Sequence, residues 1–391
     1  MPPPPLLLLT TSYPSVGYPA SGVFVARLAR ALAQTSTVVV LTPASDGSDP
    51  LPQWPGPHAF RYAPRRLQTL AHAPGGIPVA LAAHPMRKLL VAPFLVAMAF
   101  ATWRLSSGAG VLIGNWTICG VVAGLVGRLR GKPVVAVLRG EDANRAGKQV
   151  AYGWLLRTCL RLCSATVTVS EAMGEQLRTA FPGFAERIRV IPNGVSDDFL
   201  AIPGRTAPSA DLRLLFVGSL IPRKSPMTTL DALAALPAGT SLRFVGEGPE
   251  QGALERAISE RGLARRVEIL PFQPAETLPD LMAEADILIL SSFTEGRPNV
   301  VVEAFAAGLP VAASDIPGVR ELIGDDERGV LFPPGDAAAL AQAVRTLAAP
   351  PRWRVASERG RAYVETQGLS WSSTARRYQA LAGELISERN G

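Results

Sequence analysis

The sequence predicts an α/β protein with two doubly wound parallel sheets. Short aliphatic runs alternate with helical patterns along the whole chain, and such alternation is typical of parallel sheets. The length of 391 residues favours two domains, and a hydrophobic content of 48% is enough to bury two cores. Residues 201–211 contain the Pro, Gly and polar residues of a linker. We therefore expect domains at residues 1–200 and 201–370, followed by a closing segment at residues 371–391.

Five strands are expected in the first domain, each a short and mainly aliphatic run. They lie at Leu6–Leu9, Val38–Leu41, Val111–Ile113, Val134–Leu138 and Ala165–Val169. Helical patterns separate these strands. They lie at Phe24–Ala33, near residues 85–104, and at Ile118–Leu129, Ala151–Leu162 and Glu171–Phe181.

Six strands of the same kind are expected in the second domain, and a helical stretch follows each of them. They lie at Leu212–Val217, Ser241–Val245, Val267–Leu270, Asp286–Leu290, Val311–Ala313 and Val330–Phe332. The segment from Trp371 to Arg389 is expected to form one more helix.

Charge is distributed unevenly along the chain. Residues 1–200 carry 19 Lys and Arg against 9 Asp and Glu, whereas residues 201–391 carry 20 against 23. A half this basic is expected to attract phosphate groups or an anionic surface. Aromatic residues make up only 6% of the chain and do not alternate with basic residues, so a nucleic-acid partner is not expected. An anionic membrane or a lipid pyrophosphate fits this half better.

The cellular location is expected to be the cytoplasm. Three cysteines, Cys119, Cys159 and Cys163, are too few for a disulfide framework, which suits a reducing compartment. The start of the chain lacks the basic region of a secretory signal. The longest apolar segment, Leu89 to Trp103, is shorter than the ~18–20 residues of a spanning helix. It is expected to lie either on a core or on a membrane surface, which leaves peripheral contact with the inner membrane face open.

Two carboxylates flank a predicted strand–loop–helix junction. Glu295 follows the strand at Asp286–Leu290, and Glu303 lies one to two turns inside the helix expected from Val300. Ligands of open α/β sheets bind outside the carboxyl ends of strands. A helix N-terminus there offers N–H groups and a positive dipole end to a phosphate or a polyol. The spacing alone is more typical of a solvated or salt-bridged pair, so the surrounding residues decide between the two interpretations.

Those surrounding residues form a longer motif. Residues 291–315 read SSFTEGRPNVVVEAFAAGLPVAASD, and they are followed by GVRELI at 318–323 and GVLFPPGD at 329–336, with VIPNGV upstream at 190–195. This motif closely resembles the donor-site signature of glycosyltransferase family 4, whose members are retaining sugar-nucleotide transferases. The resemblance implies the GT-B fold, in which two Rossmann-like domains face a cleft and the last helix crosses back to the first domain.

The resemblance also implies an activity. It implies transfer of a hexose from a UDP- or GDP-sugar to a glycan, lipid-linked or polysaccharide acceptor. Glu303 would hold the ribose hydroxyls, and Glu295 would hold the hydroxyls of the transferred sugar. The donor would also contact the loop and helix start, which comprise Gly296, Arg297, Pro298, Asn299 and Val300.

A basic loop follows the first strand of the second domain. It begins at Gly218 and contains Arg223 and Lys224, two cations that suit a diphosphate leaving group because fixed positive charge stabilises the charge that develops there. A solvated basic turn is the alternative interpretation. Lys224 matches a Lys of the resembled family, whereas Ser219 stands where the family has an Arg. We expect Arg223 to supply the missing charge.

The following strand leads into a Gly-rich turn. Gly246 and Gly248 lie in this turn, but Gln251 interrupts the G-x-G-x-x-G spacing that a nicotinamide site requires. In the resembled family this turn lines the nucleobase pocket together with the segment that here contains Phe272.

The first domain contributes three candidate residues. Gly22 lies between the first strand and the first helix, where a positive φ would let a phosphate approach the backbone. Arg139 and Asp142 follow the strand at Val134–Leu138, and Arg139 stands where the family frequently has His. The resemblance places both near the transferred sugar or the acceptor. The alternative interpretation is that Arg139 and Asp142 form an ion pair on the surface.

Neither a metal nor a cofactor is expected beyond the nucleotide-sugar co-substrate. The sequence has no H-E-x-x-H, C-x-x-C or D-x-D cluster. Two other functions remain open. A GT-B nucleotide-sugar 2-epimerase would need acidic and His residues placed for proton abstraction at C2, and His58, His72 and His84 are not convincing candidates. A non-catalytic sugar-nucleotide or nucleic-acid binding protein would leave the donor intact.

Overall fold

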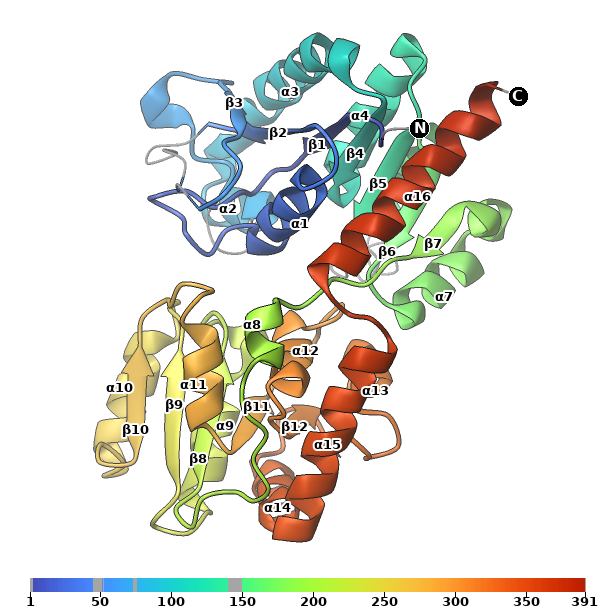
Figure 1. Ribbon diagram of the computed structural model, residues 1–391. Helices are drawn as coiled ribbons and strands as arrows, with labels where there is room; N and C mark the ends of the chain where they lie inside the picture. The colour runs from blue at the N-terminus through green and yellow to red at the C-terminus, as the bar shows by residue number, and fades with distance from the viewer. Residues whose placement is uncertain (1–2, 45–50, 52, 73–75, 140–149, 391) are drawn as a thin grey trace. The chain divides into compact units, whose positions relative to one another are not determined.

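The chain folds into two compact units, which the computed structural model shows as separate α/β bodies (Figure 1). The first unit combines Met1–Asn193 with Trp371–Gly391, and the second is Gly194–Ser370. The structure describes residues 3–44, 51, 53–72, 76–139 and 150–390.

A seven-stranded parallel sheet forms the centre of the first unit. Its strands are β1 (Leu6–Leu9), β2 (Val38–Pro43), β3 (His58–Phe60), β4 (Val111–Asn115), β5 (Val134–Leu138), β6 (Ala165–Thr168) and β7 (Ile188–Val190). They lie in the order β3-β2-β1-β4-β5-β6-β7, and neighbouring strands are parallel. The central strands are fully buried runs of Leu, Val and Ile, as expected for a sheet that is covered on both faces.

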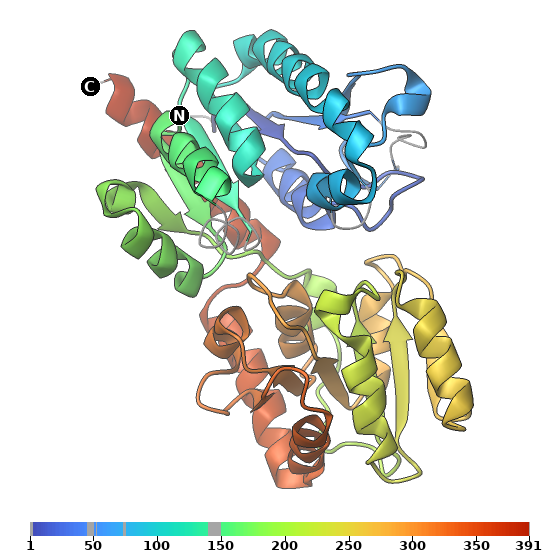
Figure 2. The ribbon, with the colours of Figure 1, turned by 180° about the vertical axis from the view of Figure 1, so that it is seen from behind.

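Helices cover both faces of this sheet. They are α1 (Val23–Ala33), α2 (Gly76–Ala83), α3 (Val91–Leu105), α4 (Trp116–Arg130), α6 (Val150–Leu162), α7 (Glu171–Ala180) and α16 (Trp371–Asn390). One core joins α1 and α16 to Leu6 and Leu8 (Figure 1). The other joins α3, α4 and α6 to Leu7 and Leu9, on the side seen in Figure 2. Successive strand residues point to opposite faces, so the run Leu6–Leu9 contributes to both cores.

The second unit contains a six-stranded parallel sheet. Its strands are β8 (Arg213–Val217), β9 (Ser241–Val245), β10 (Val267–Leu270), β11 (Ile287–Leu290), β12 (Val311–Ser314) and β13 (Gly329–Phe332). They lie in the order β10-β9-β8-β11-β12-β13. The helices are α8 (Asp197–Leu200), α9 (Pro226–Ala234), α10 (Gln251–Glu260), α11 (Leu278–Glu284), α12 (Asn299–Ala306), α13 (Pro317–Ile323), α14 (Ala337–Ala348) and α15 (Pro350–Thr366). Helices α9, α10 and α14 belong to one core, and α8, α11, α12 and α13 belong to the other.

The predicted fold class is confirmed, and the differences concern short elements and one boundary. The three-residue strands β3 and β7 were not predicted, because β3 has two exposed residues and β7 is only three residues long and ends where the motif at 190–195 begins. Val195 and Phe199 belong to the core of the second unit. The chain therefore divides after Asn193, whereas the sequence suggested a division after residue 200.

The apolar segment of the first unit packs on the core along one side, as expected for one of its two placements, and is exposed along the other. It forms a short 3-10 turn, η2 (Pro85–Leu90), and then α3. Phe94 packs edge-on against Phe60 and Tyr62 inside the core. By length and composition Pro85–Gly108 could cross a membrane, with a mean hydropathy of 1.7, yet only 22% of its most apolar stretch is buried. The remaining side chains of this stretch lie at least partly on the surface.

Candidate functional site

Each sheet has one switch point, at which the chain changes the direction in which it adds strands. In the second unit this switch point lies between β8 and β11. The chain proceeds from β8 to β9 and β10 on one side and then crosses to β11 and β12 on the other. Loops that follow the two strands at such a switch point diverge and leave room for a ligand at their carboxyl ends. The two loops here are residues 218–225 and 291–298, which contain the predicted residues Arg223, Lys224 and Glu295.

Hydrogen bonds join these two loops. Ser291 Oγ lies 3.0 Å from the carbonyl oxygen of Lys224 and 2.8 Å from that of Ser225. The backbone N–H of Phe293 donates to the carbonyl oxygen of Arg223 at 2.9 Å. The loop after β8 is therefore held against the loop after β11, and its two cations have fixed positions.

Glu295 is the centre of the resulting charge cluster. Lys224 Nζ donates to its Oε1, and Ser292 Oγ donates to the same oxygen at 2.8 Å. Arg223 Nη1 lies 3.6 Å from Oε2. Only 10% of the Glu295 side chain is exposed, whereas 41% of the Arg223 side chain is exposed. Sequence reasoning gave these residues separate ligand contacts, and the structure shows that they also bind one another.

Electrostatics keep this buried carboxylate ionised. Burial alone would raise the pKa of Glu295, but the charges of Lys224 and Arg223 and the hydrogen bonds from Lys224 and Ser292 outweigh it, so the pKa lies below its ordinary value. Two cations face one anion, so the cluster carries one net positive charge. That excess favours an anionic group at the carboxyl edge of the sheet.

The glycines of this edge let the loops pack backbone to backbone. A Cβ at Gly246 would lie 2.1 Å from the carbonyl oxygen of Gly218, and one at Gly248 would lie 2.2 Å from that of Leu220. The Lys224 side chain runs alongside Gly218, since a Cβ there would be 3.9 Å from Nζ. The packing of these loops therefore explains why glycine is needed at these positions, without reference to any ligand.

The N-terminal part of α12 lies directly after the Glu295 loop. Four predicted residues lie here. Gly296 is half-buried, Pro298 is the N-cap of α12, and Asn299 and Val300 form its first turn. Glu303 lies in the second turn and is only 5% exposed. This helix start adds its backbone N–H groups and dipole to the positive charge of the cluster.

Arg297 points in another direction. Its guanidinium is buried and interacts with Tyr363 of α15 and Glu321 of α13, and burial lowers its pKa despite both partners. This placement fastens the loop to the body of the unit. Phe272, the remaining predicted contact, is half-buried in the loop after β10, at the same edge of the sheet.

In the first unit the equivalent switch point lies between β1 and β4, and Arg139 directly follows β5, the strand next to β4. Its Nη2 donates to Asn115 Oδ1 at 3.0 Å and its Nη1 donates to Asn193 Oδ1 at 2.9 Å. The guanidinium also lies 4.4 Å from the centre of the Phe24 ring. Burial raises the pKa of Tyr378 to about 12, and the charge of Arg139 opposes that shift. Arg139 therefore connects the ends of β4 and β5 to α1 and α16.

Gly22 is the N-cap of α1, with φ at 65°. A Cβ at this position would lie 2.2 Å from the carbonyl oxygen of Ser12, so the turn requires glycine for steric reasons as well. Asp142 lies outside the residues that the structure describes.

Sequence reasoning missed the polar residues that hold the charged ones. Ser292 binds Glu295, Ser291 joins the two loops, and Asn115 and Asn193 hold Arg139. Each of them follows a predicted strand or lies in a quoted motif. Position at the carboxyl end of a strand is the signal that could have identified them.

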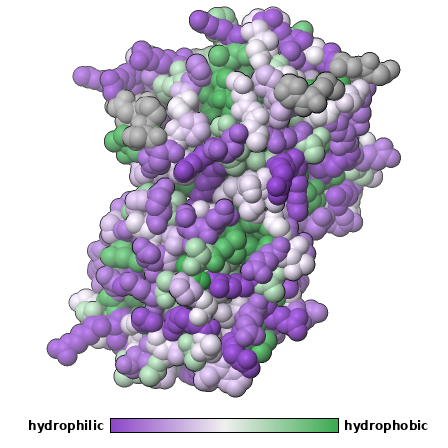
Figure 3. Space-filling view, in the orientation of Figure 1, coloured by the Kyte–Doolittle hydropathy of each residue, from purple (hydrophilic) through white to green (hydrophobic). Residues whose placement is uncertain are grey.

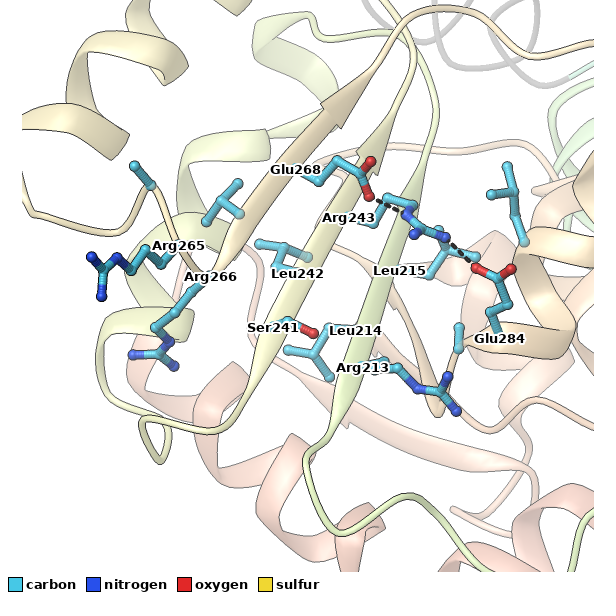
Figure 4. Close-up of a pocket in the computed structure, with 14 residues that line it drawn as sticks. Arg213, Leu214, Leu215, Ser241, Leu242, Arg243, Arg265, Arg266, Glu268 and Glu284 are labelled. Carbon is cyan, nitrogen blue, oxygen red and sulfur yellow. Dashed lines mark hydrogen bonds and ion pairs between the residues drawn. The ribbon is translucent and has the colours of Figure 1, made fainter.

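The described residues include a distinct pocket of about 420 Å³ on the opposite edge of the second sheet (Figure 4). It lies at the amino ends of β8 and β9, where Arg243 binds Glu268 at 2.6 Å and Glu284 at 2.7 Å. Ligands of open parallel sheets bind at the carboxyl edge. We therefore do not assign the functional site to this pocket. No group of three or more potential metal ligands occurs among the described residues.

Two family models match consecutive parts of the chain. Residues 21–199 match the model described as Glycosyltransferase Family 4, and residues 202–360 match the model described as Glycosyl transferases group 1. The chain belongs to glycosyltransferase family 4.

Relatives of this family 4 chain support the assignment. A glycogen synthase from Mycobacterium tuberculosis is 31% identical over 265 residues, which are 62% of this chain and 61% of the relative. The chain thus spans about three fifths of that relative. A sucrose-phosphate synthase from Thermosynechococcus elongatus has the same fold, with a TM-score of 0.76, 24% identity and coverage of 98% and 99%. Anabaena HepE in complex with UDP-glucose gives a TM-score of 0.71 at 20% identity, with coverage of 98% and 100%.

Proposed function

We propose that this chain is a retaining hexosyltransferase that uses a UDP- or GDP-sugar as donor. The observation that carries the proposal is the cluster of Lys224, Arg223 and Glu295 at the switch point of the second sheet. Its net positive charge, next to the N-terminus of α12, suits a diphosphate. The complex of a structural neighbour with UDP-glucose supports a nucleotide sugar as the ligand class.

Each group of the site then has a distinct task. Lys224 and Arg223 bind the diphosphate, Glu303 binds the ribose hydroxyls, and Glu295 binds the sugar hydroxyls. The bond between the anomeric carbon and the diphosphate oxygen breaks, and the acceptor hydroxyl forms a bond to the same carbon on the same face. The acceptor proton passes to the departing diphosphate. Positive charge at the diphosphate lowers the barrier because negative charge develops there.

The acceptor is proposed to be a glycan, a lipid-linked sugar or a polysaccharide. The relative named glycogen synthase supports a glycan, and the basic first half of the chain supports an acceptor with phosphate groups. The reaction would take place in the cytoplasm or at the inner membrane face, without a metal or a further cofactor.

A donor assay tests the proposal. Purified protein is incubated with UDP-, GDP- and ADP-sugars with and without a pool of glycan and polyprenyl-phosphate acceptors, and free nucleoside diphosphate is measured. We expect release that rises with acceptor, and NMR of the product should show the anomeric configuration of the donor. Conversion of the sugar to its C2 epimer would replace the proposal with an epimerase, and tight binding without release would indicate a binding protein.

A further inference from the structure

Helix α3 is apolar on two opposite sides, although only one side is covered by the fold. Phe94, Met98 and Thr102, spaced four residues apart, face the core of the first unit. A helix that is apolar all round is normally buried all round. The exposed side of α3 is therefore as apolar as a buried surface, although no described part of the chain packs against it.

The exposed residues of this helix form a continuous stripe. Met86 and Leu89 of η2 and Val96, Phe100 and Trp103 of α3 are all exposed, and Phe100 is 67% exposed. Spacings of four and three residues place Val96, Phe100 and Trp103 on one side of α3. The stripe is as apolar as the side that faces the core.

Neighbouring helices extend this apolar surface. Helix α3 packs beside α4, and α4 packs beside α6, as the view from behind shows (Figure 2). Leu129 of α4 is 75% exposed and Trp154 of α6 is 67% exposed. In the opposite view, hydrophobic areas are interspersed with hydrophilic side chains (Figure 3). We call the exposed side of η2, α3, α4 and α6 the α3 face.

The α3 face carries only positive charge. Lys88, Arg104, Arg128 and Arg157 are exposed on its four elements. The sequence contains no Asp or Glu between Asp49 and Glu141, or between Asp142 and Glu171, so no acidic side chain belongs to these elements. Arg130 lies 3.7 Å from the centre of the Trp103 ring, which fixes one cation beside an aromatic ring.

We propose that the α3 face binds the surface of an anionic lipid bilayer. Apolar side chains such as Phe100 enter the boundary between headgroups and acyl chains, aromatic residues such as Trp103 lie at headgroup level, and the cations contact lipid phosphates. The chain thereby acts at a membrane, which selects one of the two locations given for the proposed function and does not depend on its chemistry.

Two other occupants fit less well. A second copy of the chain would bring the same cations of both copies together in a two-fold interface, with no acidic partner for them. A transbilayer path would uncover part of the core of the first unit, because Phe94 would lose its contacts with Phe60 and Tyr62. A surface contact satisfies both the apolar and the charged residues.

Vesicle sedimentation tests this inference on the full chain. We expect the protein to bind vesicles that contain 30% phosphatidylglycerol and to bind pure phosphatidylcholine vesicles about tenfold or more weakly, since each surface cation contributes about fivefold. Binding should fall as salt rises to about 0.5 M. Val96→Ser with Phe100→Ser should weaken binding about tenfold or more through lost apolar burial. Lys88→Glu with Arg104→Glu should weaken binding by a similar factor, because acidic side chains are repelled by the anionic lipids.

Matched variants in the second unit control for nonspecific effects. Val355 is also an exposed apolar residue, and Arg354 is an exposed cation. Val355→Ser and Arg354→Glu should leave binding unchanged. Thermal unfolding should show that all variants are folded, and donor hydrolysis in solution should be unchanged, so a failed membrane test would not bear on the catalytic proposal.

A depth measurement identifies the contacting side chains. Lipids brominated near the headgroup should quench tryptophan fluorescence, and Trp103→Phe with Trp154→Phe should remove most of that quenching. Three results would overturn the inference: no binding to anionic vesicles, equal loss in the control variants, or dimerisation in solution that Phe100→Ser abolishes and that replaces lipid binding.

Discussion

At the scale of single residues, the pairing of Lys224 with Glu295 sets the charge of the site. The two residues are separated by 71 positions, and each was assigned to a different part of the donor. In the structure the carboxylate neutralises one of the two cations. The diphosphate of the proposed donor would therefore compete with Glu295 for Lys224, and Arg223, the more exposed cation, is the more accessible partner.

Removal of either cation should slow transfer. Lys224→Ala is expected to lower kcat by ~10²–10³, the effect of losing one preorganised group that stabilises developing charge. Arg223→Ala should also lower kcat, and Arg354→Ala should have no effect, since Arg354 is an exposed residue of α15. The measurement is steady-state release of nucleoside diphosphate with saturating acceptor.

An arginine at position 219 should partly rescue Arg223→Ala. Ser219 is exposed in the loop after β8, so a long side chain can be accommodated there. A double-mutant cycle of Ser219→Arg and Arg223→Ala measures the shared interaction with the diphosphate. If Arg223→Ala alone leaves kcat unchanged, Arg223 is only a surface charge and this part of the assignment is wrong.

Glu303→Ala should weaken binding of the free nucleoside diphosphate. Loss of charge-assisted hydrogen bonds to two ribose hydroxyls is expected to cost roughly 1.5–3 kcal/mol. Isothermal titration calorimetry gives the affinity, and Glu358→Ala, an exposed residue of α15, is the matched control. Unchanged affinity in Glu303→Ala would remove the assignment of this residue to the ribose.

The lowered pKa of Glu295 links stability to pH. Because its folded pKa lies below the ordinary value, the carboxylate stabilises the fold above the unfolded pKa, and that contribution is lost as pH falls through the folded pKa. The free energy of unfolding should therefore fall less steeply from pH 7 to about pH 3 in Glu295→Gln than in the original chain. Urea unfolding at several pH values measures the free energy of unfolding of both proteins. If the two free energies fell in parallel with pH, the expectation would be wrong.

At the scale of elements, close backbone packing positions the Glu295 loop. A Cβ at Gly318, in α13, would lie 2.1 Å from the carbonyl oxygen of Gly296 and 2.9 Å from that of Glu295. Neither atom belongs to a flexible side chain, so the loop itself would have to move. The geometry of the site thus depends on a glycine in a neighbouring helix.

Gly318→Ala should consequently damage the site and the fold together. We expect a loss of about 1–3 kcal/mol in the free energy of unfolding, as for other overpacked positions, together with weaker binding of nucleoside diphosphate. Gly252→Ala is the control, because a Cβ there meets only the Arg256 side chain at 3.8 Å and α10 should gain helix propensity. Equal stability of the two variants would show that the loop accommodates the methyl group.

The sequence predicted the long elements well and the polar contacts poorly. Strands such as β1 and β5 are fully buried aliphatic runs, and burial on both faces gives them an unmistakable composition. β3 has three residues and depends on pairing with β2, which no local pattern shows. Likewise, the contact of Arg139 with Asn193 joins residues 54 positions apart, and only the folded sheet brings them together.

At the scale of the whole molecule, the proposed chemistry requires no metal. The positive charge at the diphosphate comes from Lys224, Arg223 and the start of α12. Activity should therefore survive incubation with EDTA. Complete loss that magnesium restores would show that a cation performs the task assigned to these side chains.

The placement of α16 has a consequence for how the chain is made. The first unit takes its core from both ends of the sequence, since Leu28 and Ile113 share one cluster with Tyr378 and Leu381. A ribosome delivers those last residues only after the whole second unit has emerged. Residues 194–370 expressed alone should unfold cooperatively, whereas residues 1–193 should do so only when a peptide of residues 371–391 is added. A nascent chain from which residues 371–391 have not yet emerged would thus present the apolar surface that α16 covers to chaperones and proteases.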